Sequence, residues 1–288
     1  MMLWGSILAV ALQAGGPASH QALPDRQPRA KSASVATTAR KQATGPRVII
    51  DPGHGGRDPG APMRSTSLHE KDIALQVALK VGDALRAKGV DVVFTRTRDT
   101  LIALHDRGRI ANQAKGDVFI SIHVNAANPG WRNPDAARGF ETYFLAEART
   151  EDARRVEEME NESIRFESDV AVTANDPLSF ILSDMMQNEH LRESSDLAEI
   201  VQKHMDGVHP GPNRGVKQAG FRVLVTAFMP AILVELGFGT NAEEAAFMAN
   251  PSKQRAIARA IADGTREYLE RHQRRVSGGA AGASDDHD

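Results

Sequence analysis

The sequence predicts a single α/β domain built around a mainly parallel sheet with helices on both faces. Short apolar runs of strand length alternate along the chain with segments of helical length. This alternation is typical of strand–helix–strand units, which place strands in parallel and cover both sheet faces. A chain of 288 residues can bury one sizeable core, so one folded domain with tails is the simplest organisation.

The elements follow one another in a regular order. Strands are expected at 47–51, 90–96, 117–123, 139–145, 221–226 and 231–237. Helices are expected at 69–88, at 102–115 and from about 251 to 272, with a long polar, mostly helical stretch at 147–208. The first helix carries an apolar stripe of Ala74, Val77 and Val81 and ends at Gly89.

Composition narrows the chemistry. The chain has 35 basic and 37 acidic residues, so no strong field favours nucleic acid or an anionic membrane surface. It contains no cysteine, which excludes disulfides, thiolate metal ligands and cysteine nucleophiles. Any metal must therefore be bound by histidine, aspartate and glutamate.

The folded domain is expected at 46–272, with both ends of the chain outside it. Residues 1–22 contain an apolar run, Leu3 to Leu12, which has the length of a signal-peptide core although no Lys or Arg precedes it. A disordered apolar leader or a misplaced start codon would also explain this segment. Residues 23–45 are predicted to be a flexible linker and 273–288 a disordered tail. We therefore expect an exported protein of the periplasm or cell envelope.

Two histidines and two glutamates lie near the ends of predicted strands. His54 follows the first strand in the glycine-rich turn VIIDPGHGG, His123 ends FISIH, and Glu235 lies in ILVELGF. Glu70 opens the first helix, on its sheet-facing stripe. The carboxyl ends of parallel strands meet at one edge, so these side chains are expected close together. Two imidazoles and one carboxylate form a common catalytic zinc site, with a position left open for water.

Each of these residues also has a structural explanation. Glu70 could form a capping box with Ser67 in S-L-H-E, His54 could be a surface histidine, and His123 a satisfied core histidine. Glu235 is harder to explain in this way because burying an unpaired carboxylate is costly. The remaining histidines are rejected as ligands because they lie in or beside the tails, lie in polar segments or, for His69, point away from Glu70 on the helix. They are His20, His69, His105, His190, His204, His209, His272 and His287.

Several segments together resemble the zinc-dependent N-acetylmuramoyl-L-alanine amidases, the amidase-3 type catalytic domain. They are VIIDPGHGGRDPGA, EKDIALQVALKV, RGRIAN, DVFISIHVNAA, RGFETYFL and NRGVKQAGFRVLVTAFMPAILVELGFGTNAEEAAFM, followed by the last helix. The resemblance covers about residues 47–268 and implies a six-stranded sheet flanked by helices on both faces. It also implies His54, Glu70 and His123 as the metal ligands of one catalytic Zn2+ ion, and Glu235 as the catalytic residue.

The implied reaction is hydrolysis of the amide between N-acetylmuramic acid and L-alanine in peptidoglycan, in cell-wall remodelling or daughter-cell separation. One alternative is a zinc hydrolase of other cell-wall specificity, a peptidase or deacetylase. Another is a non-catalytic peptidoglycan-binding module, against which the presence of Glu235 argues. We expect no nucleic-acid partner and no stable membrane insertion after signal removal. Asn125 and Arg57 are close enough in sequence to the ligands to contact substrate.

Residues 151–187 are the main departure from the family pattern. This segment has few large apolar residues and carries the carboxylates Glu160, Glu162, Glu167 and Asp169. A solvated helical excursion is one explanation. Similar amidases of daughter-cell separation insert a segment here whose acidic residue can occupy the zinc. The resemblance therefore implies a regulatory insert with an autoinhibitory carboxylate, released by an activator protein.

Overall fold

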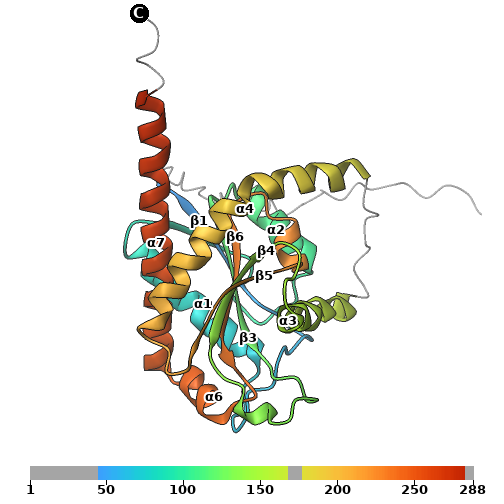
Figure 1. Ribbon diagram of the computed structural model, residues 1–288. Coiled ribbons are helices and arrows are strands. Elements are labelled where there is room, and N and C mark those ends of the chain that lie inside the picture. Colours follow the sequence, from blue (N-terminus) through green and yellow to red (C-terminus); the bar gives the residue numbers. More distant parts are fainter. Residues whose placement is uncertain (1–44, 168–176, 283–288) are drawn as a thin grey trace, which may run out of the picture. The chain divides into compact units, whose positions relative to one another are not determined.

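The computed structural model describes residues 45–167 and 177–282, without the side chains of 177–189 and 278–282. The predicted signal peptide, the predicted linker up to residue 44 and Asp169 lie outside the described residues. Within them, six strands form one sheet in the order β2-β1-β3-β6-β4-β5 (Figure 1).

The strands are β1 (Arg47–Pro52), β2 (Asp91–Phe94), β3 (Val118–Asn125), β4 (Phe140–Leu145), β5 (Asn213–Ala219) and β6 (Ala231–Phe238). Every neighbouring pair is parallel except β4 and β6, which are antiparallel. The α-helices are α1 (Glu70–Arg86), α2 (Leu104–Gln113), α3 (Glu151–Asn161), α4 (Pro177–Asp206), α5 (Arg222–Val225), α6 (Ala242–Ala249) and α7 (Pro251–Gly282). Two short 3-10 helices are η1 (Pro134–Ala136) and η2 (Glu162–Glu167). The predicted α/β fold class with a mainly parallel six-stranded sheet is confirmed.

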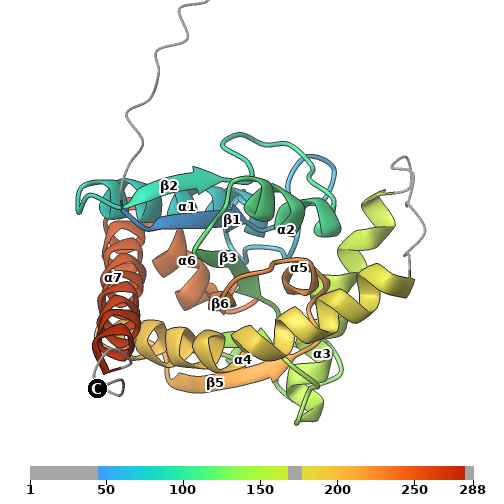
Figure 2. The same ribbon diagram turned by 90° about the horizontal axis from the view of Figure 1, so that it is seen from above.

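Each face of the sheet has its own apolar core. On β3, Val118 and Ile120 pack on one side and Phe119 on the other, as the two-residue period of a strand requires. Helices α1, α4, α6 and α7 cover the first face, and α2, α3 and α5 cover the second (Figure 2). His123, a predicted metal ligand, follows Phe119 and Ser121 on the second side of β3. The candidate site is therefore expected on this face.

Two elements near the C-terminal half differ from the prediction. Residues 221–226, predicted to be a strand, contain the short helix α5, whose Val223 and Leu224 are buried in the second core. A short apolar run fits either structure, and here the helix buries it. The missing strand is β5, which the sequence did not reveal because it is polar. As the edge strand beside β4 it is only partly buried and needs no apolar run.

Helix α7 continues to Gly282, whereas the sequence predicted that the folded domain ends at His272. Ion pairs with α4 support this extension, since the Arg275 guanidinium donates to Asp196 and Glu193, both at 2.7 Å. Among the helices of the described ranges, none has the length and apolar character needed to cross a membrane.

Candidate metal centre

His54 is held in a turn immediately after β1. Its backbone is left-handed, with φ of 55°. The buried Arg107 guanidinium donates to the carbonyl oxygens of His54 (2.9 Å) and Pro52 (2.8 Å) and to the Asp51 carboxylate (2.9 Å). His54 Nδ1 lies 2.8 Å from Asp58 Oδ2. When Nδ1–H donates to this carboxylate, Nε2 keeps a free lone pair.

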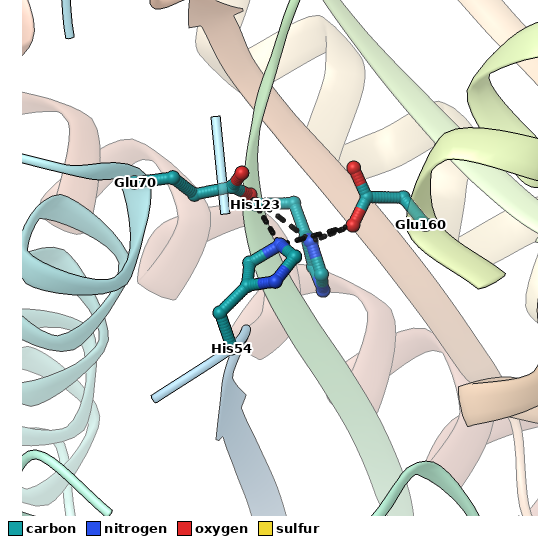
Figure 3. Close-up of side chains that lie close together, drawn as sticks. All are labelled: His54, Glu70, His123 and Glu160. Atoms are coloured by element: carbon teal, nitrogen blue, oxygen red, sulfur yellow. Dashed lines mark ion pairs between the residues drawn. The ribbon is translucent and has the colours of Figure 1, made fainter. Parts of the chain in front are cut away.

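Three further side chains converge on His54 Nε2: Glu70 from the start of α1, His123 from β3 and Glu160 from α3 (Figure 3). Glu70 Oε1 lies 3.1 Å from both His54 Nε2 and His123 Nδ1. Glu160 Oε2 lies 3.1 Å and 2.7 Å from the same two nitrogens and approaches from the side opposite Glu70. All four side chains are buried, and one ligand atom from each lies within 4.8 Å of the others.

These four residues, which we call the His54 cluster, can hold a metal ion. His54 Nε2, His123 Nδ1 and Glu160 Oε2 are buried and face one another at 2.7–3.1 Å, yet none of them makes a hydrogen bond of normal geometry with a described residue. Tetrahedral ligands about 2.0 Å from zinc would lie about 3.3 Å from one another, close to the separations in the cluster. Imidazole nitrogen and carboxylate oxygen both suit zinc. The donor set and its spacing therefore fit a zinc ion.

Two glycines leave the space that the side chains of the cluster occupy. A Cβ atom on Gly53 would lie 2.6 Å from ring atoms of His123. Gly60 has φ of 66°, and a Cβ there would lie 2.5 Å from Glu70 Oε2 and 2.7 Å from His54 Cδ2. The backbone can approach the two imidazoles this closely only because both positions lack a side chain.

The charges of the cluster also favour a cation. Burial by itself lowers the pKa of His123, but the Glu160 and Glu70 carboxylates outweigh it and raise this pKa to about 9. For His54 burial again opposes protonation, and the same carboxylates together with Asp58 raise the pKa well above its usual range. Two buried carboxylates thus attract positive charge to the imidazoles, and a metal ion can replace the protons.

Glu235 lies beside the cluster, on β6 and in register with His123 on β3. It is fully buried, and neither carboxylate oxygen has a hydrogen-bond partner in the described part of the chain. Burial raises the pKa of Glu235 well above its ordinary value, and the charges of Glu160, Glu70 and Glu141 raise it further. A buried carboxyl group of this kind is suited to accept and return a proton.

Comparison with known proteins identifies the family. The sequence pattern of the N-acetylmuramoyl-L-alanine amidases matches residues 48–267. The chain belongs to this family. It is 36% identical to the N-acetylmuramoyl-L-alanine amidase AmiA of Escherichia coli (strain K12) over 232 residues, 80% of this chain and 78% of that protein. Amidase activity on peptidoglycan follows from this membership.

Solved structures agree with the fold. An N-acetylmuramoyl-L-alanine amidase from Clostridium difficile 630 is 31% identical, with a TM-score of 0.59 over 78% of this chain and 97% of that one. The amidase AmiC2 of Nostoc punctiforme is 30% identical, with a TM-score of 0.57 over 78% of this chain and 97% of its own.

This amidase has a further buried carboxylate, Glu141 on β4. Glu141 is the register partner of Glu235 on β6, so His123, Glu235 and Glu141 follow one another across three neighbouring strands. The Glu141 oxygens accept hydrogen bonds from Asn125, Tyr143, Arg214 and Lys217. Sequence reasoning missed Glu141 because its strand reads as an ordinary apolar run. Only the antiparallel placement of β4 brings it next to Glu235.

Helix α3 and η2 cover the cluster of the amidase. Ser163 Oγ lies 3.2 Å from His54 Nδ1, and Arg57 Nε donates to the Phe166 carbonyl at 2.6 Å. A cavity of about 190 Å³ remains between this segment, His54 and Glu70. Pockets that bind small molecules usually measure about 300–1,000 Å³, so the docked segment restricts access to the cluster.

The four carboxylates suspected in this segment have different positions. Glu160 reaches the His54 cluster. Glu167 Oε1 instead accepts the backbone N–H of Leu104 at 2.7 Å, at the start of α2. Glu162 is exposed, and Asp169 lies outside the described residues.

The structure brings His54, Glu70 and His123 together and sets Glu235 beside them, as predicted. The capping alternative for Glu70 is wrong, since at the start of α1 the His69 N–H donates to Asp72 instead. The Glu70 oxygens accept the backbone N–H groups of Ala61 and Val124, both at 2.7 Å. The described histidines that were rejected as ligands lie outside the cluster: His69, His105, His190, His204, His209 and His272.

Proposed function

We propose that this protein is a zinc-dependent amidase that hydrolyses the bond between the lactyl carbonyl of N-acetylmuramic acid and L-alanine. His54, Glu70 and His123 are its zinc ligands, and Glu235 is its catalytic residue. The observation that carries the proposal is the His54 cluster, whose buried nitrogen and oxygen atoms lie at the spacing of metal ligands. Beside it lies the buried Glu235 carboxylate, which has no hydrogen-bond partner among the described residues.

The chemistry divides between the ion and the chain. Zinc supplies a Lewis acid that lowers the pKa of water to about 7 and polarises a carbonyl group. Glu235 accepts the proton of the attacking water and delivers it to the nitrogen of L-alanine as the carbon–nitrogen bond breaks. Glu235 is suited to this shuttle because it is buried and neither of its oxygens has a hydrogen-bond partner among the described residues. Asp58 holds His54 in the tautomer that presents Nε2 to the ion.

Digestion of purified sacculi, with zinc content measured on the same samples, tests the reaction. The amidase releases intact stem peptides with free L-alanine amino termini. A peptidase would shorten the peptides, and a deacetylase would release acetate, so mass spectrometry separates the alternatives. Glu235→Gln should retain zinc and lose turnover, whereas the exposed Glu243→Gln should behave as the unmodified enzyme. Peptides cut at any other bond would contradict the proposal.

The position of Glu160 supports an autoinhibited resting state. Its carboxylate occupies the side of the cluster opposite Glu70, where water and the scissile carbonyl need access. The contacts of Ser163, Phe166 and Glu167 hold this segment in place. An activator protein would then work by drawing α3 away from the cluster. Substitution of Glu160 is the most direct test, because it removes this carboxylate and leaves the rest of α3 in place.

The same proposal includes the cellular setting. Peptidoglycan lies outside the cytoplasm, and the apolar leader predicted at 1–22 suits export to the periplasm or cell envelope. An amidase kept inactive until a partner arrives suits cell-wall remodelling or daughter-cell separation, since uncontrolled hydrolysis would weaken the wall.

A further inference from the structure

Two cationic side chains on β5, Arg214 and Lys217, share one carboxylate from the covering helix. Arg214 Nη2 lies 2.8 Å and Lys217 Nζ 2.7 Å from the same oxygen, Asp152 Oδ2 on α3. Asp152 is in the first turn of α3, far along the helix from Glu160. The helix therefore holds one carboxylate at the His54 cluster and another at this cation pair.

The cation pair also contacts a carboxylate of the sheet. Glu141 Oε2 accepts from Arg214 Nε at 2.8 Å and from Lys217 Nζ at 2.5 Å. Two cations thus face one carboxylate that belongs to the sheet and one that belongs to α3. When α3 leaves, Asp152 leaves with it, and one positive charge of the pair loses its partner.

That charge would remain fixed on the sheet, because Glu141 holds both cations in place. The Arg214 and Lys217 side chains are 25% and 18% exposed while α3 is docked, and they become more accessible when it leaves. A hydrogen bond between such a cation and a carboxylate is charge-assisted and therefore stronger than a neutral one. While α3 is docked, Glu141 and Asp152 together balance the two cations. Without α3, Glu141 balances only one of them, and the other positive charge is available to a carboxylate of the substrate.

The spacing relates the cation pair to the His54 cluster. Asp152 and Glu160 are eight positions apart on α3, which corresponds to about 12 Å along the helix axis at 1.5 Å per residue. An extended peptide covers this distance in roughly three to four residues. A peptide whose first amide lies at the cluster therefore reaches the pair within its first few residues.

We propose that Arg214 and Lys217 form a carboxylate-binding subsite for the peptide arm of the substrate, which Asp152 occupies while α3 is docked. The inference rests on the proposed function, because it takes the scissile amide to lie at the His54 cluster. It adds a specificity determinant: the enzyme selects peptides with a free carboxylate near the scissile bond. In this account α3 competes with the substrate at two positions, through Glu160 at the His54 cluster and through Asp152 at the cation pair.

The test compares two synthetic muramyl tripeptides, one with free carboxylates and one in which the same groups are carboxamides. Both are assayed with the full chain carrying Glu160→Gln, which opens the cluster. We expect kcat/KM to be about tenfold or more higher for the carboxylate compound, as expected for loss of a charged hydrogen bond. Lys217→Met in this background should remove the preference, mainly through a higher KM for the carboxylate compound.

Three further variants sharpen the comparison. Lys217→Arg should keep the preference, since it retains the charge. Asp152→Asn should lower KM more for the carboxylate compound than for the carboxamide compound, because it removes the group that competes for the cation pair. Lys203→Met, on the exposed surface of α4, is the matched control and should change nothing. Zinc content and circular dichroism of each variant show whether the fold is intact.

Equal kcat/KM for the two compounds in the Glu160→Gln background would overturn the subsite and leave the proposed function standing. If the zinc-loaded protein hydrolyses neither compound, this result would instead count against the proposed function. In that case calorimetric binding of the two tripeptides still decides the subsite. Tighter binding of the carboxylate compound that Lys217→Met abolishes supports it, and equal binding overturns it.

Discussion

His123 and Glu235 are register partners on the parallel strands β3 and β6, and they lie side by side on one face of the sheet. One contributes to a cluster that can hold a metal, and the other is a buried carboxylate whose oxygens have no hydrogen-bond partner in the described chain. Both strands end at the same edge of the sheet, so the pairing follows directly from the topology.

Replacing Glu160 should activate the enzyme. Glu160→Gln removes the charged group opposite Glu70 while leaving His54, Glu70 and His123 in place, so we expect hydrolysis of sacculi to rise about tenfold or more, by analogy with other charged contacts. The control is Glu158→Gln, an exposed residue of the same helix, which should not change activity. Unchanged or lower activity of a folded, zinc-loaded Glu160→Gln variant would contradict autoinhibition by this residue.

Gly60→Ala should weaken metal binding beyond the strain it introduces. The new Cβ would lie 2.5 Å from Glu70 Oε2, so the ligand must move. Gly89→Ala is a matched control, because its φ of 81° is also left-handed but nothing lies within 4 Å of the added Cβ. Both variants should lose about 1–2 kcal/mol of stability from backbone strain. Only Gly60→Ala should lower zinc affinity in a chelator competition, and equal affinities would show that the close approach is unimportant.

The acid limb of the pH profile should move when Glu141 is neutralised. The charge of Glu141 is one cause of the raised pKa of Glu235, after burial and the other carboxylates. The base form of Glu235 is needed for the first proton transfer, so kcat/KM falls as pH drops through this pKa. Glu141→Gln removes a like charge and lowers the pKa, so the acid limb should shift to lower pH.

Profiles of kcat/KM against pH for Glu141→Gln and the exposed Glu147→Gln provide the measurement. An acid limb that stays in place, or moves upward, in Glu141→Gln would exclude the electrostatic link between Glu141 and Glu235.

Arg107→Met should destabilise the domain strongly. The buried guanidinium is the cationic partner of the buried Asp51 and also supports the His54 carbonyl. Removing one partner of such a pair costs about 3–5 kcal/mol, because the other charge remains buried. Urea denaturation of Arg107→Met and of Arg109→Met, whose side chain is 63% exposed, compares the free energies of unfolding. Similar losses in both variants would contradict the role assigned to Arg107.

Much of the fold was accessible from the sequence because its central strands are apolar and its helices amphipathic. β3 and β6 are buried along their whole length, so their runs are unambiguous. β5 was not accessible because an edge strand can be polar, and α5 was misassigned because four apolar residues fit either structure.

The site residues also fall into those that could be predicted from the sequence and those that could not. The strand-end rule and the family resemblance together lead to His54, Glu70, His123 and Glu235, since each is marked by its position on an element. Glu141, Arg214 and Lys217 carry no such mark. Glu141 lies next to Glu235 because β4 enters the sheet antiparallel to β6, and Arg214 and Lys217 reach Glu141 because β5 pairs with β4. No local pattern predicts these pairings.

Metal removal and reconstitution tests the central claim most directly. The enzyme is stripped with a chelator, supplied with zinc, and then assayed for bound zinc and for peptides released from sacculi. The unmodified chain should regain about one zinc ion per chain together with its activity, and His123→Ala should regain neither. Full activity of the stripped enzyme, or zinc binding and activity of His123→Ala equal to those of the unmodified chain, would contradict a catalytic zinc ion at this site.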